Sequence, residues 1–236
     1  ALKKEFGEKV VKLSIDAGFT CPNRDGSKGF GGCTFCSSRG SGDKASTIDD
    51  QIALLSKKWP NAKYLAYFQN YTGTYAPVPK LRELYYGVLD DPRILGLAIA
   101  TRSDCIDDEC LKLLDEINKE HFLWVELGLQ TIHEDSAHRL NLCHTLGDYD
   151  ETISKLNALN IRTVTHLILG LPSESKHDMK MSVTHAIKSN TWGLKLHLLN
   201  MISGTKLAKD LPDYLPFESM DECSCTVRKQ ATENKR

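Results

Sequence analysis

Three cysteines in one short segment have the residue type and spacing that most clearly indicate chemistry in this chain. Eleven residues separate Cys21 from Cys33, and two residues separate Cys33 from Cys36. A Cys-x2-Cys pair brings two thiolates to one turn, which is the spacing that zinc ions and iron–sulfur clusters use. Four glycines between the first two cysteines let the backbone curl closely around a bulky group. The segment therefore predicts a metal or cluster site.

The number of cysteine ligands distinguishes the kinds of site. A structural zinc ion needs four ligands, whereas this segment offers three. A fourth would have to come from the remaining cysteines, which are Cys105, Cys110, Cys143, Cys223 and Cys225. The first two flank the start of a predicted helix, where free cysteines commonly pack as small apolar side chains. A fourth ligand would make a closed zinc or cluster site, whereas three ligands favour a cluster with one open iron.

The elements that must position these residues follow an alternating pattern. Strand-like apolar runs span residues 10–15, 63–68, 94–100, 122–129, 162–170 and 193–199, and segments with helical periodicity span 46–58, 78–89, 107–118, 146–159 and 175–189. Such alternation predicts βαβ units in a parallel sheet, either doubly wound or closed as a barrel. The first run leads into the cysteine loop and not into a glycine-rich turn that opens a helix. We therefore predict an α/β fold, a partial (β/α)6 barrel of the TIM type.

Polar side chains recur at every second position near the C-terminal ends of four runs. They are Tyr67, Gln69 and Tyr71, then Glu126 and Gln130 flanking Gly128, then His166, and finally Lys195 and His197. Residues two apart on a strand share a face, and the active sites of such barrels lie at this end. We therefore expect a polar interior there. Tyr67 and Trp124 are expected to serve mainly in the core.

Composition and charge exclude several classes of protein. The chain has 236 residues, of which 41% are hydrophobic and 26% charged, and it has no run of about 18 apolar residues. The N-terminal residues do not resemble a signal peptide. We therefore expect a cytoplasmic protein without membrane association. The net charge of −1 excludes a global positive field, so any nucleic-acid site must be a local patch.

The cysteine segment, DAGFTCPNRDGSKGFGGCTFCSSRG, resembles the cluster loop of radical S-adenosylmethionine (SAM) enzymes. The resemblance is to the branch that contains the radical domain of the elongator catalytic subunit and its uncharacterised bacterial relatives. It continues through AYFQNYTGTYAP, ATRSD, WVELGLQTIHED, HLILGLPSES and KLHLLNMISGT. It implies a radical SAM core over residues 1–206 with the cluster loop at 16–42, followed by a tail of undetermined structure over 207–236.

The resemblance also implies cofactors and residue roles. A [4Fe-4S] cluster would be held by Cys21, Cys33 and Cys36, with SAM on the open iron and a donor such as flavodoxin or ferredoxin supplying the electron. Cleavage of SAM would give methionine and a 5'-deoxyadenosyl radical. The implied SAM contacts are Phe35 at the adenine, Gln69, Tyr71, Thr72 and Thr74 at the methionyl amine, and Arg102, Glu126, Gln130, Gly170 and Leu171 at the carboxylate, ribose and adenine. The Gly-Gly-Glu motif that usually meets the amine is absent.

The polar residues on the last two strands are candidates for substrate recognition. We predict that Lys195, His197 and His166 face the cavity and act on the substrate. For the lysine, the alternative is a structural ion pair with Glu126, because a buried lysine normally has a charged partner. Five other histidines lack a second ligand at metal spacing and are expected to be solvated or capping; they are His133, His138, His144, His177 and His185.

The substrate is indicated by the family branch and by the open barrel. Six strands leave one side open, and similarity to the elongator catalytic subunit implies tRNA and a wobble-uridine side chain. Because this length leaves no room for an acetyltransferase domain, we expect an existing carboxymethylaminomethyl-type group to be modified. Basic residues near the mouth would meet phosphates or form a solvated rim; they are Arg24, Lys28, Arg39, Lys44 and Arg139.

Two alternative functions remain at this point. The ATRSD and ELGLQ motifs also resemble those of oxygen-independent coproporphyrinogen oxidases, which would make the substrate a small molecule such as a porphyrin precursor. A non-catalytic iron–sulfur or zinc redox protein is the other alternative. It would have no use for Arg102, Glu126 and Gln130 at the strand ends.

Overall fold

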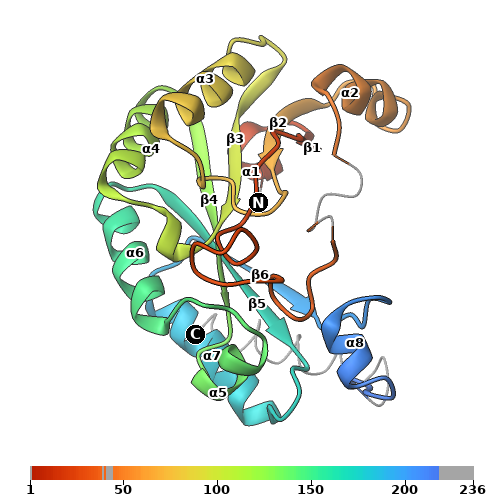
Figure 1. The fold of residues 1–236 in the computed structure, drawn as a ribbon. Helices are drawn as coiled ribbons and strands as arrows, with labels where there is room; N and C mark the ends of the chain where they lie inside the picture. Colours follow the sequence, from red (N-terminus) through yellow and green to blue (C-terminus); the bar gives the residue numbers. More distant parts are fainter. Residues whose placement is uncertain (1, 39, 41–44, 218–236) are drawn as a thin grey trace.

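The computed structural model describes residues 2–38, 40 and 45–217, and its ribbon is shown in Figure 1. Six strands form one parallel sheet whose order follows the sequence. The strands are β1 (Val10–Ser14), β2 (Lys63–Phe68), β3 (Ile94–Thr101), β4 (Phe122–Gln130), β5 (Arg162–Leu169) and β6 (Gly193–Leu198). Within the described residues, β1 and β6 each pair with one neighbour, so the sheet curls into an open partial barrel (Figure 1). The predicted fold is confirmed.

Five helices join consecutive strands and cover the outside of the sheet (Figure 1). They are α2 (Ile48–Ser56), α3 (Val78–Leu89), α4 (Asp108–Glu120), α6 (Leu146–Ala158) and α7 (Lys176–Lys188). Side-chain caps set four of their starts, because the oxygens of Thr47, Asp107, Thr145 and Ser175 accept from backbone amides of the first turn. Each sequence-predicted helix matches one of these five.

Four short helical segments were not anticipated from the sequence. They are α1 (Leu2–Phe6), the 3-10 turn η1 (Ser103–Cys105), α5 (Glu134–Arg139) and α8 (Lys206–Asp210). None exceeds six residues, so none is long enough to show a 3.6-residue period. The last one begins at residue 206, the last residue of the predicted core, and continues into the segment that we assigned to a tail.

The two faces of the sheet carry different side chains. The outer face and the helices share the main apolar core, which includes Leu13, Leu97, Leu113 and Leu127. A second, smaller cluster fills the barrel interior, and its members are Val10, Leu65, Tyr67, Ala98, Trp124 and Val164. Tyr67 and Trp124 therefore belong to the core, as predicted, although Tyr67 also reaches the cavity described below.

No helix in the described part of the chain is both long and apolar enough to cross a membrane.

Candidate active site

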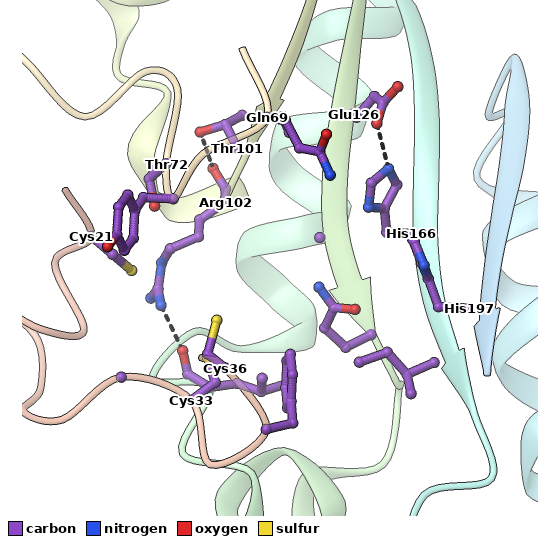
Figure 2. Close-up of a pocket in the computed structure, with 18 of the residues that line it drawn as sticks. Cys21, Cys33, Cys36, Gln69, Thr72, Thr101, Arg102, Glu126, His166 and His197 are labelled. Carbon is purple, nitrogen blue, oxygen red and sulfur yellow. Dashed lines mark hydrogen bonds and ion pairs between the residues drawn. The ribbon is translucent and has the colours of Figure 1, made fainter. Parts of the chain in front are cut away.

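A cavity of about 280 Å³ opens inside the partial barrel, at the C-terminal ends of the strands. The cysteine loop forms one wall, and polar side chains of β4 to β6 face it from the other (Figure 2). The predicted residues that line the cavity are Cys21, Cys33, Phe35, Cys36, Gln69, Tyr71, Thr72, Arg102, Glu126, Gln130, His166, Lys195 and His197. The fold therefore brings together, at one cavity, predicted residues from six separate segments of the chain.

Cys21, Cys33 and Cys36 meet at this cavity, and no other cysteine of the described residues lines it. The Cys33 to Cys36 turn is closed by a hydrogen bond from the Cys36 amide to the Cys33 carbonyl, 3.0 Å. The neighbouring Thr34 fixes the turn to the rest of the protein, since its amide donates to Leu140 O and its carbonyl accepts from the Leu207 amide. The loop is therefore held by α8 and by the residue that follows α5.

Two of the three thiols, those of Cys33 and Cys36, are partly buried and need a partner that favours their ionised form. Burial raises the pKa of Cys33 to about 12. Burial also raises the pKa of Cys36, although a hydrogen bond from Arg24 opposes that shift. A coordinated metal ion deprotonates a cysteine that burial alone would keep neutral. The donor set is thus suited to metal coordination and poorly suited to a free nucleophile.

The arrangement of these thiols fits a cluster. Among the described residues, no group of three or more His, Cys, Asp or Glu converges closely enough to hold a single metal ion. Three cysteines that line one cavity match a polynuclear iron–sulfur centre, whose cysteine ligands bind different irons. Cys105, Cys110 and Cys143 do not line the cavity and provide no fourth ligand there.

A polar group beside the cysteines has no partner of its own. Thr72 is 1% exposed and lines the cavity, and its hydroxyl has no hydrogen-bond partner in the described part of the chain. A buried polar atom without a partner costs free energy, so its place in the cavity wall suits contact with a bound ligand. Gln69 and Tyr71, which precede it after β2, line the same wall.

Arg102 lines the cavity, but its guanidinium is already engaged by the protein. Its Nε and Nη2 donate to the two carboxylate oxygens of Asp104, at 2.9 and 2.8 Å, and Nη1 and Nη2 donate to the carbonyls of Leu142 and Cys143. Lys28 completes the group, with its Nζ 2.8 Å from Asp104. Burial opposes ionisation of Asp104, yet hydrogen bonds from both cations hold its pKa at about 2.

This ion-pair group changes two expectations. The fork of Arg102, which we expected to bind the carboxylate of SAM, holds Asp104, the carboxylate two residues further along ATRSD. Lys28, which we expected at a phosphate or in a solvated rim, pairs with that same carboxylate. Asp104 was not singled out in the sequence, although its place in ATRSD was the available signal.

Glu126 is the centre of a second, larger polar group on the opposite wall (Figure 2). Its side chain is 2% exposed. Its Oε1 accepts from Lys12 Nζ at 2.9 Å and Trp124 Nε1 at 3.0 Å. Its Oε2 accepts from Tyr67 at 2.6 Å and Lys195 Nζ at 3.1 Å, and lies 2.8 Å from His166 Nε2.

The surroundings of Glu126 keep it ionised. Burial alone would raise its pKa, but the hydrogen bond with His166 and the charges of Lys12 and Lys195 hold that pKa well below its ordinary value. The ion pair between Lys195 and Glu126, which was the structural alternative for the lysine, is present in the structure. A ribose hydroxyl at Glu126 would have to displace one of its present donors.

Two histidines beside Glu126 are held neutral. Burial lowers the pKa of His166, although Glu126 opposes that change. His197 keeps an exposed edge, but partial desolvation of its ring, with smaller contributions from His166 and the Lys195 charge, lowers its pKa to about 4. Their rings lie 5.1 Å apart, centre to centre. Near neutral pH, the charged members of this group are therefore Lys12, Lys195 and Glu126. Burial lowers the pKa of Lys12, but the charge of Glu126 and its hydrogen bond oppose that change. With both lysines protonated, the net charge of the group is positive.

A third histidine corrects a sequence expectation. His144 was expected to be solvated or capping, yet it lines the cavity. Its Nδ1 lies 3.2 Å from Leu142 O, and burial lowers its pKa. It belongs to the irregular segment before α6, where no periodic pattern reports which way a side chain points.

Three of the residues assigned to SAM binding lie outside the cavity wall. The Thr74 hydroxyl lies 2.6 Å from Thr101 Oγ1 and donates to the Cys105 carbonyl, so it is used within the fold. Gly170 forms the left-handed turn after β5, with φ of 79°. Leu171 is fully buried in an apolar cluster against which Cys33 and Phe35 pack. The structure therefore gives Leu171 a supporting place behind the cysteine turn.

The remaining basic residues and cysteines have different positions. Arg24 lies over the Tyr71 ring, 5.3 Å from its centre, and also lines the cavity. Arg139 is exposed, and its Nη1 donates to Ser173 Oγ at 2.6 Å. The others lie outside the described residues; they are Arg39, Lys44, Cys223 and Cys225.

Comparison with known families identifies the class of protein. Residues 21–186 match the model of the Radical SAM superfamily, and that match begins at the first cysteine of the cavity. The chain therefore belongs to the radical SAM superfamily, whose members use a [4Fe-4S] cluster and SAM. The site fits this chemistry, because three cysteines line one end of a cavity that has room for a further ligand.

Individual relatives place the chain more closely. It is 43% identical over 231 residues to the uncharacterised protein YtqA of Bacillus subtilis, a match that covers 94% of this chain and 71% of that protein. Elongator complex protein 3 of Schizosaccharomyces pombe is 29% identical over 121 residues, covering 50% of this chain and 22% of that one. The sequence resemblance to the branch that contains the elongator catalytic subunit and its bacterial relatives is confirmed.

The fold has counterparts among solved structures. The archaeal Elp3 of Methanocaldococcus infernus superposes with a TM-score of 0.62 at 16% identity. That match covers 97% of this chain and 54% of the solved chain, so this chain spans about half of the length of the solved protein. At this level of identity the likeness concerns the fold, which is the radical SAM partial barrel.

The Glu126 group generates a stability prediction. In Glu126→Gln the carboxylate charge is lost, so Lys12 and Lys195 face each other without a counter-ion. The two lysines keep 29% and 31% of their side-chain surface exposed, so the loss should fall short of that for a fully buried pair. We expect the free energy of unfolding to fall by about 2–3 kcal/mol, measured by urea denaturation.

The matched control is Glu116→Gln, which removes the surface ion pair with Arg82. Because both of its side chains are about half exposed, this change should leave the unfolding midpoint almost unchanged. Equal midpoints for the two variants would contradict the central place of Glu126.

The His197 site generates a pH prediction. Histidine NMR of the protein should show His197 titrating near pH 4, and not near 6.5, because burial and the neighbouring Lys195 charge disfavour its protonated form. Removing that charge in Lys195→Met should raise the His197 pKa towards 6.5. A His197 midpoint near 6.5 in the unmodified protein would refute the neutral assignment; loss of its resonance in His197→Gln supplies the assignment.

Proposed function

We propose that this radical SAM enzyme modifies the side chain of a wobble uridine in tRNA, starting from a carboxymethylaminomethyl-type group. The observation that carries the proposal is one cavity with three cysteines on one wall and a positively charged polar group on the other. A [4Fe-4S] cluster held by Cys21, Cys33 and Cys36 would supply the reductive cleavage of SAM, and with it the 5'-deoxyadenosyl radical that abstracts hydrogen from the substrate. The residues of this chain hold the cluster, orient the substrate and exclude water.

The charge of the cavity supports an anionic group on the substrate. Lys12 and Lys195 both contact Glu126, which leaves one positive charge in excess while His166 and His197 stay neutral. Lys195 is 31% exposed and lines the cavity, so its ammonium is accessible to a ligand. A carboxymethylaminomethyl side chain carries a carboxylate that matches this excess charge.

The openness of the barrel supports a large substrate. Within the described residues, β1 and β6 do not pair with each other, so the barrel is open between them. The sequence resemblance to the elongator catalytic subunit, together with the match to Elongator complex protein 3, favours RNA over a porphyrin precursor. The proposal for RNA rests on this relative together with the open side.

A reducing cytoplasm suits such a site. The six described cysteines are free thiols, and cytoplasmic conditions keep thiols reduced. We therefore place the enzyme in the cytoplasm, with a small electron-carrier protein as its reductant.

The cluster assignment is tested by anaerobic reconstitution of iron and sulfide. In Cys33→Ala one of three ligands is lost, so we expect loss of the cluster absorbance and at least a hundredfold less 5'-deoxyadenosine formed with dithionite and SAM. Cys143→Ala is the matched control, because Cys143 is exposed and outside the cavity. A Cys33→Ala variant that still cleaves SAM would exclude the proposed ligand set.

The substrate assignment is tested with a synthetic anticodon stem-loop. We expect 5'-deoxyadenosine formation and a mass change of the nucleoside when the wobble base is carboxymethylaminomethyluridine, and neither with plain uridine. Lys195→Met should raise KM for this RNA about tenfold, since one hydrogen bond between charged groups contributes about 1.5–3 kcal/mol. Turnover with coproporphyrinogen III and none with the RNA would overturn the assignment.

A further inference from the structure

A second hollow lies against the same cysteine turn that borders the active-site cavity. It is a groove of about 560 Å³, and Cys33 and Cys36 line it as well as the cavity. Its other walls come from the ends of two short helices, α5 and α8, and from Phe30. We call it the outer groove. The turn between the two cysteines is thus a thin wall with the reaction on one side and the outer groove on the other.

The charges around the outer groove have one sign. Among the described residues, no Asp or Glu lines it, whereas its basic side chains are Arg24, His138, Arg139 and Lys206. Arg139 and Lys206 are exposed, and the latter also pairs with Asp210 on its own helix. The whole chain has a net charge of −1, so this local excess of positive charge is not a reflection of the overall composition.

An apolar side chain stands beside these charges. Phe30 is 78% exposed, which makes it the most exposed large apolar residue in the described part of the chain, ahead of Leu215 at 77%. An exposed aromatic residue rimmed by basic groups is typical of a protein interaction site. Backbone atoms also face the groove, because Gly31 and Gly32 line it without side chains.

A protein bound at the outer groove would contact residues that are joined directly to the cysteine turn. Thr34, between Cys33 and Phe35, joins the turn to Leu140 O and the Leu207 amide at 2.9 and 2.8 Å. Its hydroxyl is buried, lines the groove and has no hydrogen-bond partner among the described residues. A partner seated on α5 and α8 would therefore rest on the same short segment that carries two cluster ligands.

We infer that the outer groove is the docking surface for the electron donor, an acidic flavin-carrying protein such as flavodoxin. The inference rests on the proposed function, since a chain that holds the cluster requires such a donor. One electron leaves the donor's flavin and passes to the cluster, so the flavin is oxidised by one electron and the cluster reduced by one. Electron transfer slows steeply with distance, and the thin cysteine wall places the donor close while the cavity side stays free for SAM and substrate.

The inference is tested by stopped-flow reduction of the reconstituted holoenzyme with fully reduced flavodoxin at low salt. The variant Arg139→Glu with Lys206→Gln should slow the second-order rate on the order of tenfold, since charges at an interface rim act on association rates. Phe30→Ser gives an independent variant that leaves the charges unchanged and should also slow it. Lys112→Glu on the exposed surface of α4 is the charge control and should have little effect.

Two further measurements separate this inference from the proposed function. Binding of oxidised flavodoxin, followed by calorimetry, should weaken in the groove variants and with added salt, while reduction by dithionite should stay within about twofold of the unmodified enzyme because so small a reductant needs no docking. Absence of a dithionite-reducible cluster in the unmodified protein would instead defeat the proposed function.

Either of two results would contradict the assignment of the outer groove as the docking surface. Flavodoxin reduction that is unchanged in both groove variants, with the cluster intact, would overturn it. So would groove variants that lose affinity for the anticodon stem-loop and keep the flavodoxin rate, because the basic groove would then be an RNA surface.

Discussion

One buried carboxylate ties the open barrel together. The donors that meet Glu126 come from five strands: Lys12 from β1, Tyr67 from β2, Trp124 from β4 itself, His166 from β5 and Lys195 from β6. The two edge strands are therefore connected through side chains although they share no backbone hydrogen bonds in the sheet. A charge buried at this depth is favourable only when it is fully paired, so the position of each of these side chains constrains the others.

This constraint also shapes the site. Because Glu126 uses its two oxygens within the protein, the positive charge that remains belongs to the lysines, and Lys195 presents it to the cavity. The opposite wall is held in a similar way by Arg102, which joins Asp104 to the carbonyls before α6. The cysteine turn packs on the apolar cluster that contains Leu171. Each wall thus has its own rigid support, and the space between them is left for ligands.

The fold and one face of the site could be predicted because they follow from periodic patterns. Alternation of strands and helices indicates the barrel, and alternate polar residues near strand ends indicate the cavity, as Gln130 and His197 illustrate. A periodic sequence pattern shows which residues share a face of a strand or helix, but it does not show which residue each of them contacts. It could not show that Lys12 of the first strand reaches Glu126, more than a hundred residues away, or that Arg102 would be occupied by Asp104.

Irregular segments set the other limit to prediction. His144 lines the cavity because Arg102 donates to a backbone carbonyl of the loop before α6 and holds that loop in place. This contact is tertiary, so the local sequence does not predict it. Thr74, two residues after Thr72, turns instead to Thr101 and Cys105 because the strand has ended and alternation no longer applies. The outer groove likewise depends on α5 and α8, which are too short to be recognised from periodicity.

The most direct measurement of the central claim is electron–nuclear double resonance of the reduced, reconstituted protein with SAM labelled in its amine with ¹⁵N and in its carboxylate with ¹⁷O. A three-cysteine cluster with one open iron predicts hyperfine coupling of both labels to the cluster spin, and loss of both couplings when the labelled SAM is omitted. A cluster signal that shows no coupling to either label would contradict the account, because the site would then be closed to SAM.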